Sequence, residues 1–316
     1  MTTQQKNRMK GDRCLFPIRD GRKLLFEVTN KCNARCEVCC SNSSMDSNGE
    51  ELSLAEATEF LDWFAARGCN EVYFSGGEPL LRSDFLEMLE YGRSLFERVQ
   101  FSTNGFLGSQ ETVRHLAHIQ PNAVGISLDA ANPSQHDAMR QLPGLFENAT
   151  TFARQLSESD IHVRLQATIR QNNLDQMSPL FNLAHKLGVS GILFQTVITA
   201  GRLQDADEQS NHADFIGQFY ENIEKIQDQA HEESPTLMYY GNPYARHMFP
   251  TECPAGTSFF YLTPAGKISG CPWLQKMGFM PSQPKTDSAL KLLQETFEKN
   301  NISPTGCPAM LRSYSA

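Results

Sequence analysis

The strongest constraint on the fold is a regular alternation of short apolar runs with longer amphipathic stretches between residues 23 and 196. This alternation is typical of repeated strand–helix units, which form a parallel sheet covered by helices. It predicts six strands, at 24–28, 71–74, 99–102, 123–128, 161–168 and 191–195. Helices are expected after an N-cap at Ser53 and over about 83–96, 111–119, 145–156, 174–187 and 213–230. The fold class is therefore predicted to be α/β.

The sequence changes character after Gly201. A polar segment at 202–212 leads to one long predicted helix, and the region 234–284 is rich in Pro, Gly and aromatic residues. That composition indicates turns and a hairpin. We therefore divide the chain into an N-terminal extension at 1–22, a parallel-sheet domain at 23–205 and a C-terminal domain at 206–316.

Composition argues against several classes of partner. The chain has 316 residues, with 28 Lys and Arg against 36 Asp and Glu, and it lacks a basic stripe that could follow phosphates. A nucleic-acid partner is therefore not expected. No apolar run approaches the roughly 18 residues of a membrane span, and residues 1–13 lack the apolar stretch of a signal peptide. We expect a cytoplasmic protein with no membrane partner.

Nine cysteines are present, and four of them lie between residues 32 and 40. An odd number with such close spacing favours metal-binding thiolates in a reducing compartment over a disulfide framework. Cys32, Cys36 and Cys39 form a Cys-x3-Cys-x2-Cys motif directly after the first predicted strand, at the ligand-binding edge of such a sheet. Three thiolates can hold three irons of a cubane cluster and leave the fourth iron open to a ligand. The alternative is a zinc site, which would need a cramped fourth ligand at Cys40.

This motif resembles the signature of the radical S-adenosylmethionine (SAM) superfamily, and later segments match the family in order. Residues 75–79 read Ser-Gly-Gly-Glu-Pro, residues 102–105 read Ser-Thr-Asn-Gly, and residues 127–129 read Ser-Leu-Asp. The resemblance covers about residues 23–200. It implies a partial (β/α)6 TIM-like barrel with a small C-terminal α+β extension. It also implies a [4Fe–4S] cluster on the three cysteines of the motif, with SAM at the open iron.

The resemblance also implies which residues would bind SAM. The backbone at Gly76 and Gly77 and the carboxylate of Glu78 would receive the methionine amino group, since glycine lets the backbone approach a ligand closely. Ser127 and Arg140 would hold the ribose and the methionine carboxylate, and a guanidinium suits a carboxylate well. The other cofactor-binding candidates are Ser102, Asn104 and Asp129.

The chemistry implied by the resemblance is radical chemistry. The reduced cluster would cleave SAM to methionine and a 5′-deoxyadenosyl radical, which would abstract hydrogen from a substrate carbon. An external electron donor such as flavodoxin or ferredoxin would be required. Cys40 and Cys69 are candidate hydrogen donors to a substrate radical, although a small buried side chain is the commoner role of such cysteines.

A second set of cysteines lies towards the C-terminus. Cys253, Cys271 and Cys307 stand beside Pro and Gly residues, and a hairpin would bring the first two together. The pattern resembles the SPASM extension, which carries an auxiliary iron–sulfur cluster, and its three cysteines fit the shortened twitch form better. Cys14 is a candidate for a further ligand, without an assigned role. The alternative is three separate buried cysteines.

Together these features favour an enzyme that matures a ribosomally made peptide by oxidation, crosslinking or epimerisation. Only about twenty residues precede the predicted barrel, so a separate leader-peptide recognition protein, or direct binding in a groove, would be needed. The second interpretation is a dehydrogenase or epimerase of a small molecule such as an aminocyclitol or a sugar. The third is a non-catalytic iron–sulfur electron carrier, which would have no use for the Gly-Gly-Glu motif.

Overall fold

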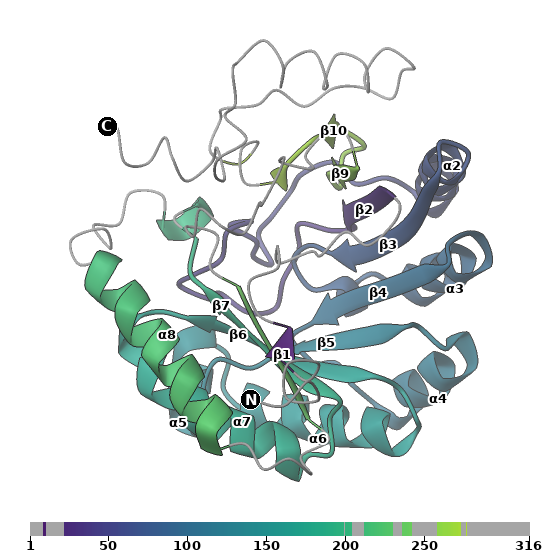
Figure 1. The fold of residues 1–316 in the computed structure, drawn as a ribbon. Coiled ribbons are helices and arrows are strands. Elements are labelled where there is room, and N and C mark those ends of the chain that lie inside the picture. The colour runs from purple at the N-terminus through teal and green to yellow at the C-terminus, as the bar shows by residue number, and fades with distance from the viewer. Residues whose placement is uncertain are drawn as a thin grey trace.

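A computed structural model describes residues 9–10, 22–198, 200–203, 212–229, 236–241, 258–272 and 276. Its strands form one curved sheet, with helices along the outer face (Figure 1). The strand order is β1-β8-β7-β6-β5-β4-β3-β2-β9-β10. The strands are β1 (Met9–Lys10), β2 (Arg22–Glu27), β3 (Cys69–Ser75), β4 (Arg98–Thr103), β5 (Ala123–Ser127), β6 (Val163–Ile169), β7 (Gly191–Thr196), β8 (Leu237–Gly241), β9 (Phe259–Leu262) and β10 (Ile268–Ser269).

The six predicted strands correspond to β2 to β7, and each pairs in parallel with the next one in the chain. The predicted α/β class and the partial TIM-like barrel are therefore confirmed. One helix, α5, is absent from the sequence-based prediction, because His136 is its only buried residue and no apolar stripe marks it. The helices are α2 (Leu54–Ala65), α3 (Phe85–Leu95), α4 (Gln110–Ile119), α5 (Pro133–Arg140), α6 (Leu145–Glu158), α7 (Met177–Lys186) and α8 (His212–Gln229).

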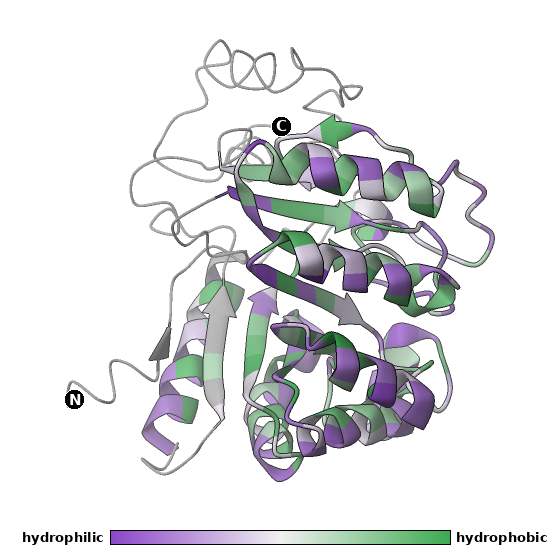
Figure 2. Cartoon of the chain, turned by 90° about the vertical axis from the view of Figure 1, so that its right-hand side faces the viewer, coloured by the Kyte–Doolittle hydropathy of each residue, from purple (hydrophilic) through white to green (hydrophobic). Residues whose placement is uncertain are grey.

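Local sequence explains where helices begin. Ser53 and Glu56 form the predicted cap of α2: the Glu56 amide donates to Ser53 Oγ at 3.3 Å, and the Ser53 amide donates to Glu56 Oε2 at 2.8 Å. At α4, Ser109 Oγ accepts from the Thr112 amide at 3.1 Å. Figure 2 shows hydrophilic and hydrophobic residues alternating around the helices, as expected of helices that pack one face on a sheet.

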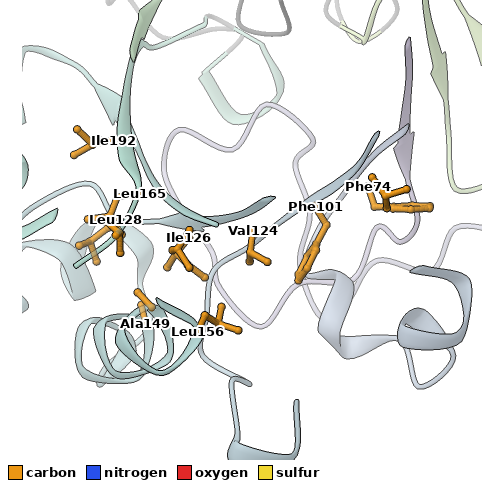
Figure 3. Packing of buried hydrophobic residues seen from close by; sticks show 14 of the residues in the cluster. Phe74, Phe101, Val124, Ile126, Leu128, Ala149, Leu156, Leu165 and Ile192 are labelled. Atoms are coloured by element: carbon orange, nitrogen blue, oxygen red, sulfur yellow. The ribbon is translucent and has the colours of Figure 1, made fainter. Parts of the chain in front are cut away.

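The main core lies between the outer face of the sheet and the helices. Alternate strand residues point into it, and Figure 3 shows Phe101, Val124 and Leu165 in the same packed layer as Ala149 and Leu156 of α6. The intervening strand residues face the concave side, where many are polar or charged. A closed TIM barrel fills this interior with Val, Ile and Leu. The polar concave side is therefore available for binding.

The chain returns to the same sheet after residue 205. α8 packs against α7, and β8 pairs in parallel with β7, so the sheet extends past the position of the predicted domain boundary. β9 and β10 form an antiparallel hairpin, as expected for this region, and β9 also pairs in parallel with β2. Cys14, Cys253 and Cys307 lie outside the described residues. None of the described helices is both long and apolar enough to cross a membrane.

Candidate active site

The concave side of the sheet holds a cavity of about 340 Å³. The loop that carries the cysteine motif, between β2 and α2, closes it at the carboxyl ends of the strands. Most of the predicted site residues line this cavity: Cys32, Cys36, Cys39, Cys40, Gly76, Gly77, Ser102, Asn104, Ser127 and Arg140. The other predicted residues in the described part of the chain, Glu78, Asp129, Cys69 and Cys271, are not among the lining residues.

Each sulfur of the cysteine motif accepts a hydrogen bond from a different donor. The Ser43 amide donates to Cys39 Sγ at 3.4 Å, and Arg140 Nη1 donates to Cys36 Sγ at 3.7 Å. The Asn104 side-chain amide lies 4.0 Å from Cys32 Sγ. Donors of this kind orient metal-bound thiolates and tune the potential of an iron–sulfur cluster. The loop therefore provides sulfur ligands together with the groups that support them.

The three thiols are close enough to affect one another electrostatically. Burial first, and then the nearby Glu78, Cys36 and Cys39, together raise the pKa of the Cys32 thiol to about 12. Burial also raises the pKa of Cys36, partly offset by Arg140. Among the described residues, no three His, Cys, Asp or Glu side chains are placed to hold a single metal ion. The donor set fits a group that is bound by sulfur and carries positive charge, since such a group stabilises thiolates.

Gly76 and Gly77 are required by chain packing. A Cβ atom at Gly77 would lie 2.1 Å from the carbonyl oxygen of Lys31, and one at Gly76 would lie 2.5 Å from that of Thr29. Gly76 also has a φ of +129°, which favours glycine. The Gly77 amide donates to the Thr29 carbonyl at 2.8 Å. The two glycines thus hold the end of β3 directly against the chain that leads into the cysteine motif.

The Glu78 carboxylate does not line the cavity, and its contact with the SAM amino group stays a prediction. The side chain is fully buried. Its oxygens accept from Thr103 Oγ1 at 2.6 Å, from the Asn104 amide at 2.7 Å and from the Leu80 amide at 3.0 Å. Glu78 therefore joins the ends of β3 and β4 and positions the residues around it.

Asp129 likewise positions a neighbour. Its Oδ2 accepts from Arg140 Nε at 2.6 Å, and its Oδ1 accepts from the Thr168 amide at 2.9 Å. The side chain is 1% exposed. Although burial opposes the charged form, Asp129 and Cys36 raise the pKa of Arg140, so its guanidinium stays charged. Asp129 is thus a support for Arg140 and lies outside the cavity lining.

Below the cysteines, three polar side chains form a ring across the cavity. Ser102 Oγ contacts the Tyr73 hydroxyl and donates to Gln166 Oε1 at 2.8 Å, and Gln166 Nε2 donates to the Tyr73 hydroxyl at 2.8 Å. Gly125 makes this possible, because a Cβ there would lie 2.5 Å from Gln166 Nε2. Ser102 therefore helps to hold the polar ring in the middle of the cavity.

Two predicted hydrogen donors lie at opposite ends of the sheet. Cys40 lines the cavity, and burial raises the pKa of its thiol, so it keeps its hydrogen at neutral pH. Cys69 begins β3, six residues before Ser75, which is about 20 Å along a strand. It is buried and does not line the cavity, and its role as a hydrogen donor to a substrate stays a prediction. Cys271 is also buried, next to the β9–β10 hairpin.

A group of charged residues, not predicted from the sequence, also lines the cavity. Glu27 accepts from the Tyr261 hydroxyl at 2.8 Å and from Ser41 Oγ at 2.9 Å, and it pairs with Lys276. At the other end of the strands the missed residues are Lys23, Glu71, Arg98 and Arg164. The available signal is charge at alternate positions of otherwise apolar strands, which marks a polar inner face.

The sequence and the fold are both similar to those of known proteins. The model of the Radical SAM superfamily matches residues 26–201. The AdoMet-dependent heme synthase of Methanosarcina barkeri is 30% identical over 271 residues, which cover 80% of this chain and 77% of that protein. The antilisterial bacteriocin subtilosin biosynthesis protein AlbA of Bacillus subtilis is 27% identical, over 78% of this chain and 54% of that one. Streptococcus suis SuiB bound to S-adenosylmethionine has a similar fold, with a TM-score of 0.73 at 14% identity, over 89% of this chain and 68% of that one.

Proposed function

The chain belongs to the radical SAM superfamily, and from this premise we propose that it matures a ribosomally made peptide by abstracting hydrogen from one of its carbons. Enzymes of this family use a [4Fe–4S] cluster and SAM, which supply the hydrogen-abstracting radical by one-electron cleavage of SAM. An external electron donor such as flavodoxin or ferredoxin, and a separate leader-peptide recognition protein, are parts of the proposal.

The cysteine motif is proposed to hold the cluster. Cys32, Cys36 and Cys39 line one cavity, and each of their sulfurs accepts a hydrogen bond. Arg140 supplies one of these donors and is held by Asp129 at 2.6 Å, so the guanidinium has a defined direction. This arrangement keeps positive charge beside a thiolate, which favours the deprotonated ligand.

The SAM site is proposed to lie directly beside the motif. The backbone at Gly76 and Gly77 is held against residues 29–31 and lines the cavity there. Ser127 and Arg140 line the same part of the cavity and are proposed to bind the ribose and the methionine carboxylate. Glu78 and Asp129 act through their neighbours, as positioning residues.

The limited volume of the cavity carries the peptide proposal. At about 340 Å³ it is near the lower end of the range of small-molecule pockets, which is about 300–1,000 Å³. SAM bound beside the cysteine motif would take up part of this space. A peptide can insert one side chain while the rest of it stays outside. The similarity to AlbA, which is named for bacteriocin biosynthesis, supports the same substrate class.

The other substrate classes have weaker support. A small alcohol or sugar would also fit the remaining space, so it stays as the second candidate. The similarity to an AdoMet-dependent heme synthase favours a tetrapyrrole on identity alone, but a whole macrocycle is much larger than a side chain. Cys40 is proposed as the hydrogen donor if the product is an epimer, because its protonated thiol lines the cavity.

The first test separates cluster binding from general damage to a cysteine. Anaerobically purified Cys36→Ala should produce no 5′-deoxyadenosine from SAM under dithionite, because the cluster loses one of three protein ligands. Cys69→Ala is the matched control, since Cys69 is buried at the opposite end of β3, and it should keep this activity. Cleavage by Cys36→Ala at the rate of the unmodified protein would overturn the cluster assignment.

The second test concerns the substrate. If the reaction is oxidation or crosslinking, the enzyme with SAM and reductant should remove two hydrogens from a ribosomal peptide encoded beside it, which mass spectrometry detects. The same change on a small alcohol, with no change on the peptide, would overturn the peptide proposal.

A third test concerns the auxiliary cluster. Cys271→Ala should lower the iron content to about one cluster and stop product formation while SAM cleavage persists, as expected if Cys253, Cys271 and Cys307 hold an auxiliary cluster.

A further inference from the structure

The hydroxyl of Ser43 is a buried polar group that the proposed function does not use. Ser43 lines the cavity and is only 1% exposed. Among the described residues, its Oγ is buried and has no hydrogen-bond partner. We propose that the Ser43 hydroxyl donates a hydrogen bond to a sulfur atom of the cluster proposed for the cysteine motif. The contact depends on the cluster assignment, which is part of the proposed function.

Both backbone groups of Ser43 already have partners. Its amide donates to Cys39 Sγ at 3.4 Å, and its carbonyl oxygen accepts from Arg202 Nη2. The hydroxyl is therefore the polar group of Ser43 that is left for a ligand in the cavity. Because the amide of the same residue contacts the sulfur of a proposed cluster ligand, the hydroxyl belongs to a residue placed directly at the cluster site.

Arg202 gives this part of the cysteine loop a defined position. Its Nη1 donates to the Cys36 carbonyl at 2.5 Å, and its amide donates to the Cys39 carbonyl at 3.1 Å. Gly201 allows this close approach, because a Cβ there would lie 2.4 Å from the Cys39 carbonyl oxygen. The segment after β7 therefore holds the carbonyls of two motif cysteines and of Ser43, and it fixes the backbone from which the hydroxyl extends.

An iron–sulfur cluster is a suitable acceptor for this hydroxyl. A buried donor without an acceptor destabilises the folded state, so a buried hydroxyl that lines a cavity favours a ligand that accepts from it. Sulfide and thiolate sulfurs accept hydrogen bonds, and they accept more strongly when the cluster gains an electron. The hydroxyl should therefore stabilise the reduced cluster more than the oxidised one and raise the reduction potential.

The test is a redox titration of the anaerobically purified full chain without SAM, followed by electron paramagnetic resonance of the reduced cluster. Ser43→Ala should shift the one-electron reduction equilibrium threefold to tenfold towards the oxidised cluster, which lowers the potential by about 28–59 mV. The potential is measured on clusters that are present, so partial loss of iron does not alter it. Ser43→Thr keeps the hydroxyl and should restore the potential of the unmodified protein.

Ser47→Ala is the matched control. Ser47 lies in the same loop, where its Oγ accepts from the Ser44 amide at 3.1 Å, but it does not line the cavity. The cluster of this variant should have the potential of the unmodified protein. An unchanged potential in Ser43→Ala, or an equal shift in Ser47→Ala, would overturn the contact and leave the cluster assignment standing.

Two further outcomes concern the identity of the acceptor. A shift in Ser43→Ala that appears only after SAM is added would assign the hydroxyl to SAM and overturn its contact with the cluster. An unmodified protein that is colourless and free of iron would overturn the cluster assignment and the contact together.

Discussion

Single side chains decide how the site is supported, and Arg140 is the clearest case. It contacts Asp129 through Nε and Cys36 through Nη1, and its carbonyl oxygen accepts from the Arg35 amide at 3.0 Å. One residue of α5 thus braces the cysteine loop by both its side chain and its backbone. The family motif locates Arg140 and Asp129 in the sequence. It cannot show that Asp129 faces the arginine, because that direction depends on the Thr168 amide of another strand.

Loss of the Asp129 charge should therefore destabilise the whole protein. Asp129→Asn leaves a buried guanidinium without its carboxylate, and the free energy of unfolding should fall by about 3 kcal/mol. Urea denaturation followed by circular dichroism measures this change. Asp62→Asn is the control, because Asp62 is exposed and its carboxylate accepts a hydrogen bond from the Tyr91 hydroxyl. Its free energy of unfolding should change by no more than about 0.5 kcal/mol. Similar values for the two variants would contradict a buried ion pair.

His136 should make stability depend on pH. Burial and the charge of Arg140 together lower the pKa of His136 to about 4, against the opposing effect of Asp129 and Asp137. The unfolded state, with a pKa near 6.5, then binds more protons than the folded state. The free energy of unfolding should fall as the pH drops from about 6.5 to 4, by at most about 1.4 kcal/mol per pH unit from this residue.

Replacement of His136 tests that contribution directly. His136→Asn keeps an acceptor for the Asp129 amide, which His136 Nδ1 accepts at 3.1 Å, but removes the titratable ring. Urea denaturation at pH 7 and pH 5 should show a smaller loss of stability in the variant than in the unmodified protein. Equal losses in both proteins would assign the acid sensitivity to other groups.

Whole elements were easier to predict than the contacts between them. The runs that form β2 to β7 and the cap of α2 follow from local sequence, because burial and capping act within a few residues. α5 is missed because its residues are mostly polar. The charged residues at the starts of the strands, such as Glu71 and Arg98, are missed because they lie in apolar strands, and the curvature of the complete sheet decides which of its faces is concave. Local sequence patterns do not contain that curvature.

Gly77, which follows β3 and packs against the cysteine loop, should not tolerate a side chain. Gly77→Ala places a Cβ atom 2.1 Å from the Lys31 carbonyl, so the loop must move. We expect a loss of stability of about 2 kcal/mol and a lower iron content per chain. Gly217→Ala is the matched control: a Cβ on this exposed α8 residue meets no atom within 4 Å, and helix propensity should raise stability by up to about 1 kcal/mol. Equal iron contents in the two variants would contradict the packing role.

Across the whole molecule, one buried network joins the first parallel strand to the C-terminal region. Glu27 on β2 is held by Tyr261 on β9 and by Lys276, and Ser41 of the cysteine loop contacts both charged groups. Although burial opposes ionisation, Lys276 lowers the pKa of Glu27, so the carboxylate stays charged. β2, β9 and Lys276 therefore meet beside the cysteine motif.

Removal of the Tyr261 hydroxyl should loosen this connection. Tyr261→Phe leaves Glu27 with one donor fewer, and the free energy of unfolding should fall by about 1–2 kcal/mol. Hydrogen exchange should also become faster at the amides of β9 than at those of β5. Tyr91→Phe, whose hydroxyl contacts an exposed carboxylate, should leave both measurements nearly unchanged. An unaltered exchange rate at β9 in Tyr261→Phe would show that the hairpin is held by its strand pairing alone.

Because β9 borders β2, the edge of β2 is completed by residues that are synthesised after all of β2 to β8. Until β9 is synthesised, that edge has no neighbour on this side, whereas the segment bearing Cys32, Cys36 and Cys39 is synthesised early. Iron proposed to bind the motif can therefore be delivered before β9 covers this edge, whereas iron delivered after synthesis meets a sheet in which β9 is already paired with β2.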